Sequence, residues 1–211
     1  MSTTKYDVAI LGGGAIGLCS AYYLSARGIS VAVIDKGEMG HGSSLHNACY
    51  ISPSHFLPLA APGLILQALK WMANPVSPLY VKPRLDLHFL AWAWKFARAC
   101  NGQTMGKAMP VLRDLLLESA RLTDELSHVD GMNFHLTRRG LVILFNTEQG
   151  RGTCEHEQHL ADEVGIDARL LDRRGLEELD PGIEFRAHGG VYFPGDMHLV
   201  PAAFVQNLAT H

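Results

Sequence analysis

The sequence predicts an α/β fold that opens with a parallel strand–helix–strand unit, and three observations near the start of the chain support this. The apolar run YDVAIL at residues 6–11 is typical of a buried strand, and so is the run ISVAVID at residues 29–35. Between them, residues 15–27 have the composition of a helix, which Gly28 is expected to end. Two parallel strands joined by a helix in this way form a βαβ unit.

The turn between the first strand and the helix has Gly12, Gly14 and Gly17 in the spacing GxGxxG. Gly12 permits a tight turn, Gly14 lets a pyrophosphate approach the backbone, and Gly17 lets the helix pack closely on the strand. The N–H groups at the helix N-terminus favour phosphates, and Asp35 at the end of the second strand can accept hydrogen bonds from a ribose diol. This order favours a dinucleotide site over a chance glycine turn with a solvated acid. Asp35 disfavours NADP because it repels a 2′-phosphate, but the motif does not separate FAD from NAD.

The remaining residues are predicted to form helices and strands after a long loop. Residues 36–63 are rich in glycine, serine and proline, and a stretch of this length without regular structure favours a functional loop. Pro110 suits the first turn of a helix because no N–H is needed there, whereas Gly165 and Pro181 are expected to end two later helices. The expected elements are, in order, helices at 64–73, 86–100 and 110–128, a hairpin over 134–146 with its turn at Arg138–Gly140, a helix at 148–164, a strand at 168–172, a short helix at 173–180, a strand at 189–194 and a last helix opened by Pro201.

The composition describes an ordinary globular protein, with 47% hydrophobic residues, 18% charged residues and a net charge of -3. The absence of a dense basic run argues against a nucleic-acid partner. The four cysteines lie far apart without a CxxC pair, which argues against a zinc site or a disulfide framework and suits a reducing compartment. The apolar stretch at 85–100 is interrupted by charged residues, so we expect a buried or interfacial helix and no transmembrane span. The expected location is the cytoplasm.

Residues 42–72 form a block with a distinctive order of small, polar and proline residues. Its features are, in order, Ser43-Ser44, Asn47-Ala48, Ile51-Ser52-Pro53, Ala60-Ala61-Pro62-Gly63 and Lys70-Trp71. This block resembles the corresponding stretch of bacterial FAD-dependent D-amino-acid dehydrogenases, which belong to the D-amino-acid oxidase-like flavoprotein superfamily. The segments TRRGLVILFNTEQ at 137–149 and GGVYFPGDMHLVPAAFVQNLA at 189–209 are similar to that family as well.

The resemblance implies a fold and a cofactor. The fold is the N-terminal part of a Rossmann-like FAD-binding domain with part of an α+β substrate domain, in a chain that looks truncated beside its relatives. The FAD-binding part is expected at 1–63 and 189–211, where the second segment is the strand that returns toward the flavin, and the substrate part at 64–188. The implied FAD-binding residues are Gly12, Gly13, Gly14, Ala15, Ile16, Gly17, Asp35, Lys36, Ser43, Ser44, Asn47 and Ala48.

The resemblance also implies a reaction, namely two-electron oxidation of the Cα–N bond of a D-amino acid or D-imino acid. Hydride passes to flavin N5, and the imino acid hydrolyses to a 2-oxo acid and ammonia. The implied partners are the amino acid and an electron acceptor that is a quinone or another respiratory carrier, which leaves open a peripheral position at the inner membrane. No catalytic acid or base can be assigned from the sequence. The stretch CEHEQH at 154–159 is interpreted as a charged surface and not as a metal site.

Two residues depart from the family pattern. Cys49 stands where relatives usually have a glycine beside the flavin, and His46 is interpreted as an ordinary loop residue beside a non-covalent flavin. Two alternatives stay open. The same βαβ unit serves NAD-dependent dehydrogenases, and the chain could also be a truncated, non-catalytic fragment that holds no flavin.

Five further residues receive structural interpretations. Trp71, Trp92 and Trp94 are expected to be core or interface anchors and not the lining of a substrate path. Arg138 and Arg139 are expected at a solvent-facing turn, although either could reach a carboxylate.

Overall fold

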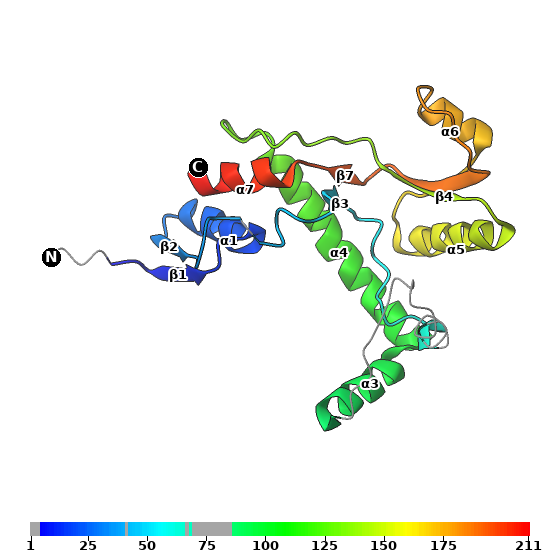
Figure 1. Cartoon of the computed structure of the whole chain (residues 1–211), viewed down its shortest axis with the longest axis horizontal. Coiled ribbons are helices and arrows are strands. Elements are labelled where there is room, and N and C mark those ends of the chain that lie inside the picture. Colours follow the sequence, from blue (N-terminus) through cyan, green and yellow to red (C-terminus); the bar gives the residue numbers. More distant parts are fainter. Residues whose placement is uncertain (1–4, 41, 66–67, 69–85) are drawn as a thin grey trace.

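The computed structural model describes residues 5–40, 42–65, 68 and 86–211. The helices and strands are β1 (Val8–Leu11), α1 (Ala15–Ser25), β2 (Val31–Ile34), β3 (Tyr50–Ile51), α3 (Leu87–Ala99), α4 (Gly102–Leu126), β4 (Leu141–Phe145), α5 (Glu148–Val164), β5 (Arg169–Asp172), α6 (Arg173–Leu179), β6 (Gly189–Phe193), β7 (Met197–His198) and α7 (Pro201–Thr210). The group β1, α1, β2 and α7 lies at one end of an elongated molecule, and β4, β5, β6, α5 and α6 lie at the other (Figure 1). The short β3–β7 pair lies between the two groups.

The predicted βαβ unit is confirmed. β1 and β2 are parallel and pair in register from Val8 opposite Val31 to Leu11 opposite Ile34. The prediction that both strands are buried is wrong, because Leu11 is 81% exposed and Ile34 is 53% exposed. Parallel sheets are normally covered on both faces, whereas in the described part of the chain this sheet has two strands and helices α1 and α7 beside it.

The second sheet is antiparallel and has the strand order β4–β6–β5. Its central strand, β6, begins the segment expected to return toward the flavin. Later in that segment, β7 pairs with β3 and α7 packs against α1. Alternate residues of β6 point to opposite faces, and Val191 and Phe193 are buried in a core with residues of α5. Phe56 from the long loop packs in the same core, so the loop is fastened to this sheet.

The predicted hairpin over 134–146 is wrong. β4 pairs with β6, while the preceding segment turns away and pairs elsewhere, with Thr137 bridged to His198 and the Phe134 carbonyl accepting from the Val200 N–H at 3.0 Å. Gly140 does mark a bend, because its N–H donates to the Asp196 carbonyl at 3.0 Å. The tertiary partners therefore override the local turn signal.

The predicted start of the third helix at Pro110 is also wrong. α4 begins at Gly102, after the Asn101 side chain accepts a hydrogen bond from the Thr104 N–H at 2.9 Å, and Pro110 lies inside the helix. An internal proline costs roughly 3 kcal/mol, which packing must offset. Four buried residues along α4 supply such packing, namely Met109, Ala120, Thr123 and Leu126.

Most of the other described elements confirm their predictions to within a few residues, whereas the two-residue strands β3 and β7 were not predicted. α1, α5, β5, α6, β6 and α7 form where expected, and α3 starts after Asp86, whose side chain accepts from two backbone N–H groups. Of the helix expected at 64–73, residues 64, 65 and 68 are helical and the rest lies outside the described residues. None of the helices in the described ranges is long and apolar enough to cross a membrane.

The tryptophans were expected to be core or interface anchors; on α3 the core expectation is wrong, and the interface expectation stays a prediction. Trp92 is 52% exposed and Trp94 is 60% exposed. Trp92 stacks on Phe96 with ring centroids 5.4 Å apart, and the Arg98 guanidinium lies 4.7 Å from the Trp94 ring centroid. These contacts stay within one helix. Trp71 lies outside the described residues.

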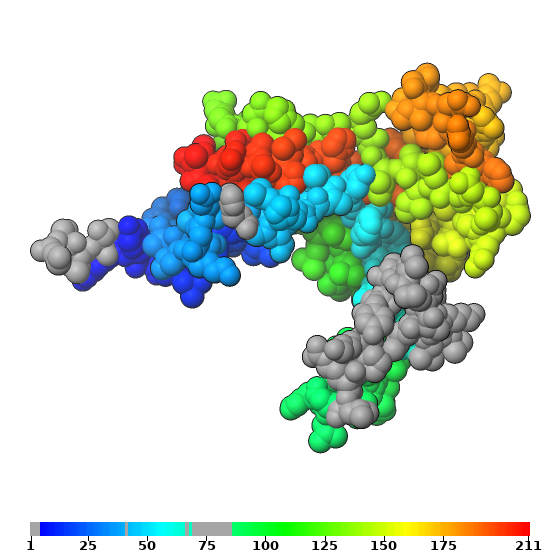
Figure 2. All heavy atoms as spheres, viewed as in Figure 1, coloured from blue at the N-terminus to red at the C-terminus, as the bar shows by residue number. Residues whose placement is uncertain are grey.

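A second core joins the two ends of the chain. Leu18 of α1 packs with Val205 and Leu208 of α7, and Phe134 and Leu126 belong to the same cluster. In the space-filling view α7 lies along the group formed by β1, α1 and β2 (Figure 2). The last helix therefore supports the first, and through α7 the second half of the chain contacts the glycine-rich turn.

Candidate cofactor-binding site

The glycine-rich turn has the close packing that its spacing predicts. A Cβ at Gly17 would lie 2.0 Å from the Gly12 carbonyl oxygen, so no larger residue fits without moving backbone. Gly12 has a φ of 109°, which L side chains rarely adopt. Strand β1 and helix α1 therefore meet as closely as in a phosphate-binding turn.

Asp35 is fastened to this turn. Its Oδ2 accepts a hydrogen bond from the Gly13 N–H at 2.6 Å, and its Oδ1 accepts from the Gly37 N–H at 3.0 Å. These two bonds, that of Gly13 first, lower the pKa of the Asp35 carboxyl from its usual value. Because the folded pKa is lowered, this contribution to stability is complete above the ordinary carboxyl pKa and is lost as the pH falls through the lowered value.

The carboxylate keeps acceptor capacity for a ligand. Two carboxylate oxygens offer about four lone-pair directions. The N–H groups of Gly13 and Gly37 use two of them, and the Lys36 N–H is a third backbone partner. Asp35 is only partly buried, which leaves acceptor capacity for a ribose hydroxyl.

We expect Asp35→Asn to lower the affinity for FAD by about 10- to 100-fold, corresponding to the ~1–3 kcal/mol of hydrogen bonds to a charged group. Flavin fluorescence titration measures the change. Asp130→Asn removes the same charge from an exposed loop position and serves as the matched control. Equal affinities of the two variants would exclude Asp35 as a ribose ligand.

Ser44 brings the long loop onto the N-terminus of α1. Its Oγ accepts a hydrogen bond from the Ala15 N–H at 3.0 Å. A Cβ at Gly14 would lie 3.1 Å from the same Oγ, so the loop lies against the bare backbone of the helix start. Sequence reasoning expected the loop and the turn to share one ligand, and the structure brings the two together.

Asn47 organises the next bend of the loop. Its Nδ2 donates to the Ser44 carbonyl at 2.9 Å, and its Oδ1 accepts from the Cys49 N–H at 2.8 Å. The bend leads into a hollow of about 230 Å³ beneath the helix start. The hollow is lined by Ala15, Ser44, Asn47, Ala48, Cys49, Tyr50, Ile51, Leu199, Pro201, Phe204 and Val205.

The remaining predicted ligands do not line this hollow and are exposed. Ser43 and Lys36 are exposed, and Ile16 is 86% exposed at the first turn of α1. His46 is exposed in the loop. Direct contact of Ser43, Lys36 or Ile16 with FAD stays a prediction, and His46 was not predicted to be a ligand.

Cys49 adopts a backbone conformation that favours glycine. Its φ is 67°, in the left-handed region. A non-glycine residue there costs roughly 1–2 kcal/mol. This agrees with the interpretation that Cys49 occupies a position where relatives have glycine.

We expect Cys49→Gly to raise the free energy of unfolding by up to about 1 kcal/mol, because relief of the left-handed strain outweighs the larger entropy of glycine in the unfolded chain. Denaturant midpoints measure the difference. Cys49→Ala keeps a Cβ in the same conformation and should give no such gain. A gain in the alanine variant equal to that in the glycine variant would contradict the explanation.

Sequence reasoning missed the residue that anchors the far end of the loop. Asp196, 1% exposed, accepts hydrogen bonds from the Ser54 N–H at 3.0 Å and from the Ser54 Oγ at 2.7 Å. The two residues are 142 positions apart, so no local pattern signals the contact. Met39 was missed as well, although a Cβ at Gly13 would lie 2.1 Å from its sulfur.

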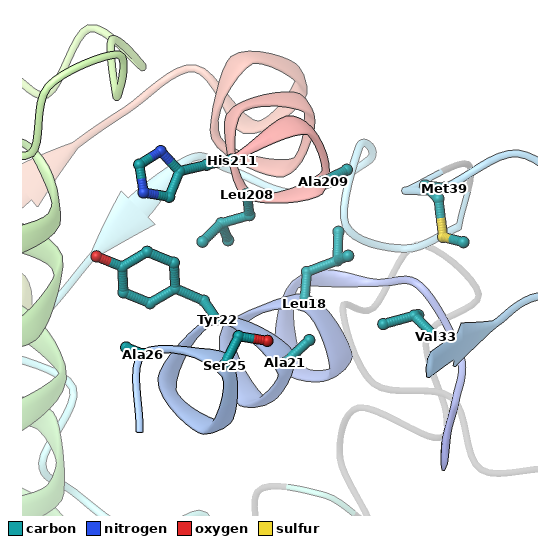
Figure 3. A pocket seen from close by; sticks show the side chains of 10 residues that line it. All are labelled: Leu18, Ala21, Tyr22, Ser25, Ala26, Val33, Met39, Leu208, Ala209 and His211. Carbon is teal, nitrogen blue, oxygen red and sulfur yellow. The ribbon is translucent and has the colours of Figure 1, made fainter. Parts of the chain in front are cut away.

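A larger hollow of about 410 Å³ lies between α1, β2 and α7 (Figure 3). Its lining is mostly apolar and includes Leu18, Val33 and Leu208, with the rings of Tyr22 and His211 5.6 Å apart. The glycine turn, Asp35 and Ser44 do not line it. Ala15 and Ser44 line the smaller hollow, so it is the smaller hollow that adjoins the start of α1.

Comparisons with known proteins show the family to which the chain belongs. The profile of the FAD dependent oxidoreductase family (DAO) matches residues 7–211. A D-amino acid dehydrogenase of Granulibacter bethesdensis is 31% identical over 193 residues, which cover 90% of this chain and 46% of the relative. A D-amino acid dehydrogenase of Vibrio atlanticus is 31% identical over 198 residues, covering 90% of this chain and 46% of that protein. The chain thus spans about half the length of the curated relatives it matches.

Solved structures show the same fold. A glycine oxidase from Geobacillus kaustophilus superposes with a TM-score of 0.62 at 23% identity, covering 98% of this chain and 44% of that one. An L-α-glycerophosphate oxidase of Mycoplasma pneumoniae, solved with FAD bound, superposes with a TM-score of 0.62 at 16% identity over 99% of this chain and 42% of that one. With its glycine turn, its acid at the end of β2 and a family profile covering nearly all of its length, the chain belongs to the FAD dependent oxidoreductase (DAO) family.

Proposed function

We propose that the protein containing this chain oxidises a D-amino acid or a D-imino acid at its Cα–N bond and passes the electrons to FAD. The observation that carries the proposal is the meeting of Asp35, Gly13 and Ser44 at the N-terminus of α1. Two relatives named D-amino acid dehydrogenase, each 31% identical over most of this chain, support the choice of substrate.

The residues present fit FAD. The pyrophosphate binds beside the backbone between Gly12 and Gly17, because the glycines have no Cβ where the phosphates approach. The N-terminus of the helix favours the negative charge of the phosphates. Asp35 accepts hydrogen bonds from the adenosine ribose. Ser44, Asn47 and Ala48 contact the cofactor along its length. They line the same hollow as Cys49 and Tyr50.

FAD, when bound, supplies the hydride acceptor at flavin N5. The chain has to hold the substrate Cα close to that atom and to exclude water. The walls of the hollow beside Ser44, with Ile51, Leu199 and Phe204, are apolar and suit a ring system. The proposed electron acceptor is a quinone or another respiratory carrier, and the proposed location is the cytoplasm or the surface of the inner membrane.

We further propose two domains. Residues 1–63 hold FAD together with the returning segment, and residues 64–188 belong to the substrate domain. Since β6 (Gly189–Phe193) pairs with β4 and β5, we place the return to the flavin domain after β6, at β7 and α7.

The two alternatives make different predictions. An NAD-dependent dehydrogenase would bind NAD at this turn and would show no flavin absorbance. A fragment without flavin would bind neither dinucleotide. Titrating the purified protein separately with FAD and with NAD, and following protein fluorescence, distinguishes the three. We expect tight binding of FAD alone, and binding of NAD alone would contradict the proposal.

A further inference from the structure

The face of the second sheet opposite α5 has a cavity that the proposed function has not used. Val191 and Phe193 of β6 point into the core with α5, so Tyr192 between them points to the other face. On that face lies a cavity of about 430 Å³, and its lining includes Arg139, Val142, Asp180, Phe185, Tyr192 and His198. The mixture of apolar walls and a few polar groups is typical of small-molecule sites.

This cavity adjoins the candidate FAD site. His198 lines the cavity and pairs directly with Tyr50 in the β3–β7 ladder. Tyr50 in turn lines the hollow that Ser44 and Cys49 share. Directly paired residues of antiparallel strands have Cβ atoms about 4.5–5.5 Å apart, so one residue pair separates the two sites.

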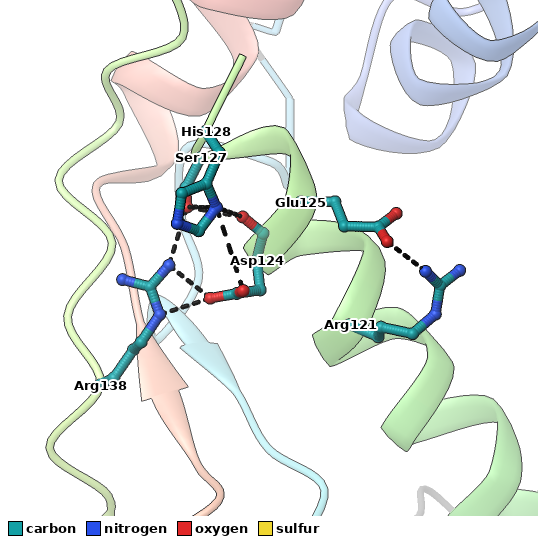
Figure 4. A network of polar contacts seen from close by, with 6 residues as sticks. All are labelled: Arg121, Asp124, Glu125, Ser127, His128 and Arg138. Carbon is teal, nitrogen blue, oxygen red and sulfur yellow. Dashed lines mark hydrogen bonds and ion pairs between the residues drawn. The ribbon is translucent and has the colours of Figure 1, made fainter.

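Arg138 and Arg139 are neighbours in sequence but have different partners. The guanidinium of Arg138 donates to the Asp124 carboxylate and, at 2.8 Å, to the Ser127 Oγ (Figure 4). These bonds fasten the segment before β4 to the end of α4. The guanidinium of Arg138 therefore has a structural role.

Arg139 is loosely paired. Its Nη2 lies 3.9 Å from the Asp180 Oδ2, beyond hydrogen-bond distance, and its side chain is 71% exposed. Exposed pairs of this kind contribute about 0–1 kcal/mol, so a ligand can replace the contact at little cost. Asp180 is the one acid paired with the Arg139 side chain among the described residues.

The backbone of Arg139 is nevertheless fixed. The Tyr192 hydroxyl donates to the Arg139 carbonyl at 3.3 Å, and the Gly140 N–H donates to the Asp196 carbonyl at 3.0 Å. The Tyr192 ring packs against Gly140, where a Cβ would lie 2.3 Å from it. The base of the Arg139 side chain is thus held at the rim of the cavity, while its guanidinium is available.

We propose that Arg139 binds a carboxylate of the amino-acid substrate in this cavity. The proposal rests on the proposed function and names a group that recognises its substrate. A guanidinium presents paired N–H donors that match the two oxygens of a carboxylate. Val142, Phe185 and Tyr192 offer apolar surface for the rest of the molecule.

The test uses the FAD-loaded protein and probes that cannot be oxidised at a Cα–N bond. 3-Phenylpropionate carries one carboxylate beside an apolar group, glutarate carries two carboxylates, and phenethylamine carries none. Isothermal titration calorimetry gives the Kd of each probe for the wild type, Arg139→Met and Arg138→Met. Arg138→Met removes the same charge from the adjacent position and is the matched control.

We expect Arg139→Met to weaken 3-phenylpropionate binding by about 10-fold or more, as for a lost hydrogen-bonded ion pair, and to leave phenethylamine unchanged. Arg139→Lys should recover part of the affinity, because it restores the charge without the fork. Loss of glutarate binding alone would assign Arg139 to an acidic side chain of the substrate, which also supports the proposal.

Equal affinities of wild type and Arg139→Met for both carboxylates would overturn the proposal, and so would an equal loss in Arg138→Met. FAD affinity is measured in the same samples. Failure of the wild type to bind FAD would contradict the proposed function instead, so the two failures are distinguishable.

Discussion

Replacing Gly14 with valine should abolish retention of FAD during purification and lower its affinity by about 100-fold or more, which corresponds to ~3 kcal/mol. A Cβ at this position would lie 3.1 Å from the Ser44 Oγ, and valine adds two methyl groups beyond it. Those methyl groups occupy the space through which a pyrophosphate reaches the helix N-terminus. Flavin released by heat and quantified by fluorescence measures the loss.

The matched control for this variant is Gly152→Val on α5. A Cβ at Gly152 meets nothing within 4 Å, so the same substitution leaves the flavin content unchanged. Circular dichroism of both variants separates loss of FAD from loss of fold, and the smaller Gly14→Ala should fold with an intermediate affinity. Full flavin content in folded Gly14→Val would refute the placement of the pyrophosphate.

Replacing Gly140 with alanine should lower the free energy of unfolding by about 2–5 kcal/mol, the sum of left-handed strain and overpacking. Gly140 has a φ of 73°, and its Cβ would lie 2.3 Å from the Tyr192 ring and 2.7 Å from the Phe193 carbonyl oxygen. The backbone oxygen cannot move without disturbing β6. Denaturant unfolding at equilibrium measures the loss.

Gly131→Ala separates the two causes. Gly131 has a φ of 85°, and its Cβ would meet nothing within 4 Å. This variant pays only the left-handed strain of roughly 1–2 kcal/mol. If both variants lose the same stability, then contact with Tyr192 and Phe193 contributes nothing, and the packing argument for the bend at Gly140 is wrong.

The elements that the sequence predicted well have local signals at their ends. α5 runs from Glu148 to Val164 as expected, because the Thr147 side chain accepts from the Gly150 N–H at 3.0 Å and Gly165 ends the helix. α7 likewise begins at Pro201. Such caps act within one turn of the chain, so the sequence displays them directly.

The predictions that were wrong concern elements whose surroundings come from distant residues. The sequence predicted a hairpin turn at Arg138–Gly140, but this segment pairs with distant residues instead. Thr137 is bridged to His198, and the Gly140 N–H donates to the Asp196 carbonyl. The sequence predicted a helix start at Pro110, because proline is a stronger signal for a helix start than the asparagine at position 101, which is the actual N-cap. The apolar character of β1 and Trp92 predicted burial, but burial depends on which elements cover them.

In the candidate site too, the local features were predictable from the sequence and the contacts between distant residues were not. The glycine spacing and Asp35 were readable because the βαβ unit places them together within a short stretch. The position of Ser44 followed from the resemblance alone, since a gap of 29 residues separates it from its partner Ala15. The difference between Arg138 and Arg139 could not be read from the sequence, because it depends on Asp124 and Asp180.

The most direct test of the central claim is the visible spectrum of the purified protein containing this chain, recorded without oxygen before and after addition of each member of a panel of D-amino and D-imino acids and of their L-enantiomers. We expect the spectrum of bound oxidised flavin, bleached by at least one D-compound and much more slowly by its L-enantiomer, and no flavin spectrum in Gly14→Val. A wild-type protein that stays colourless after incubation with FAD would contradict this expectation, as would a flavin that only L-compounds bleach.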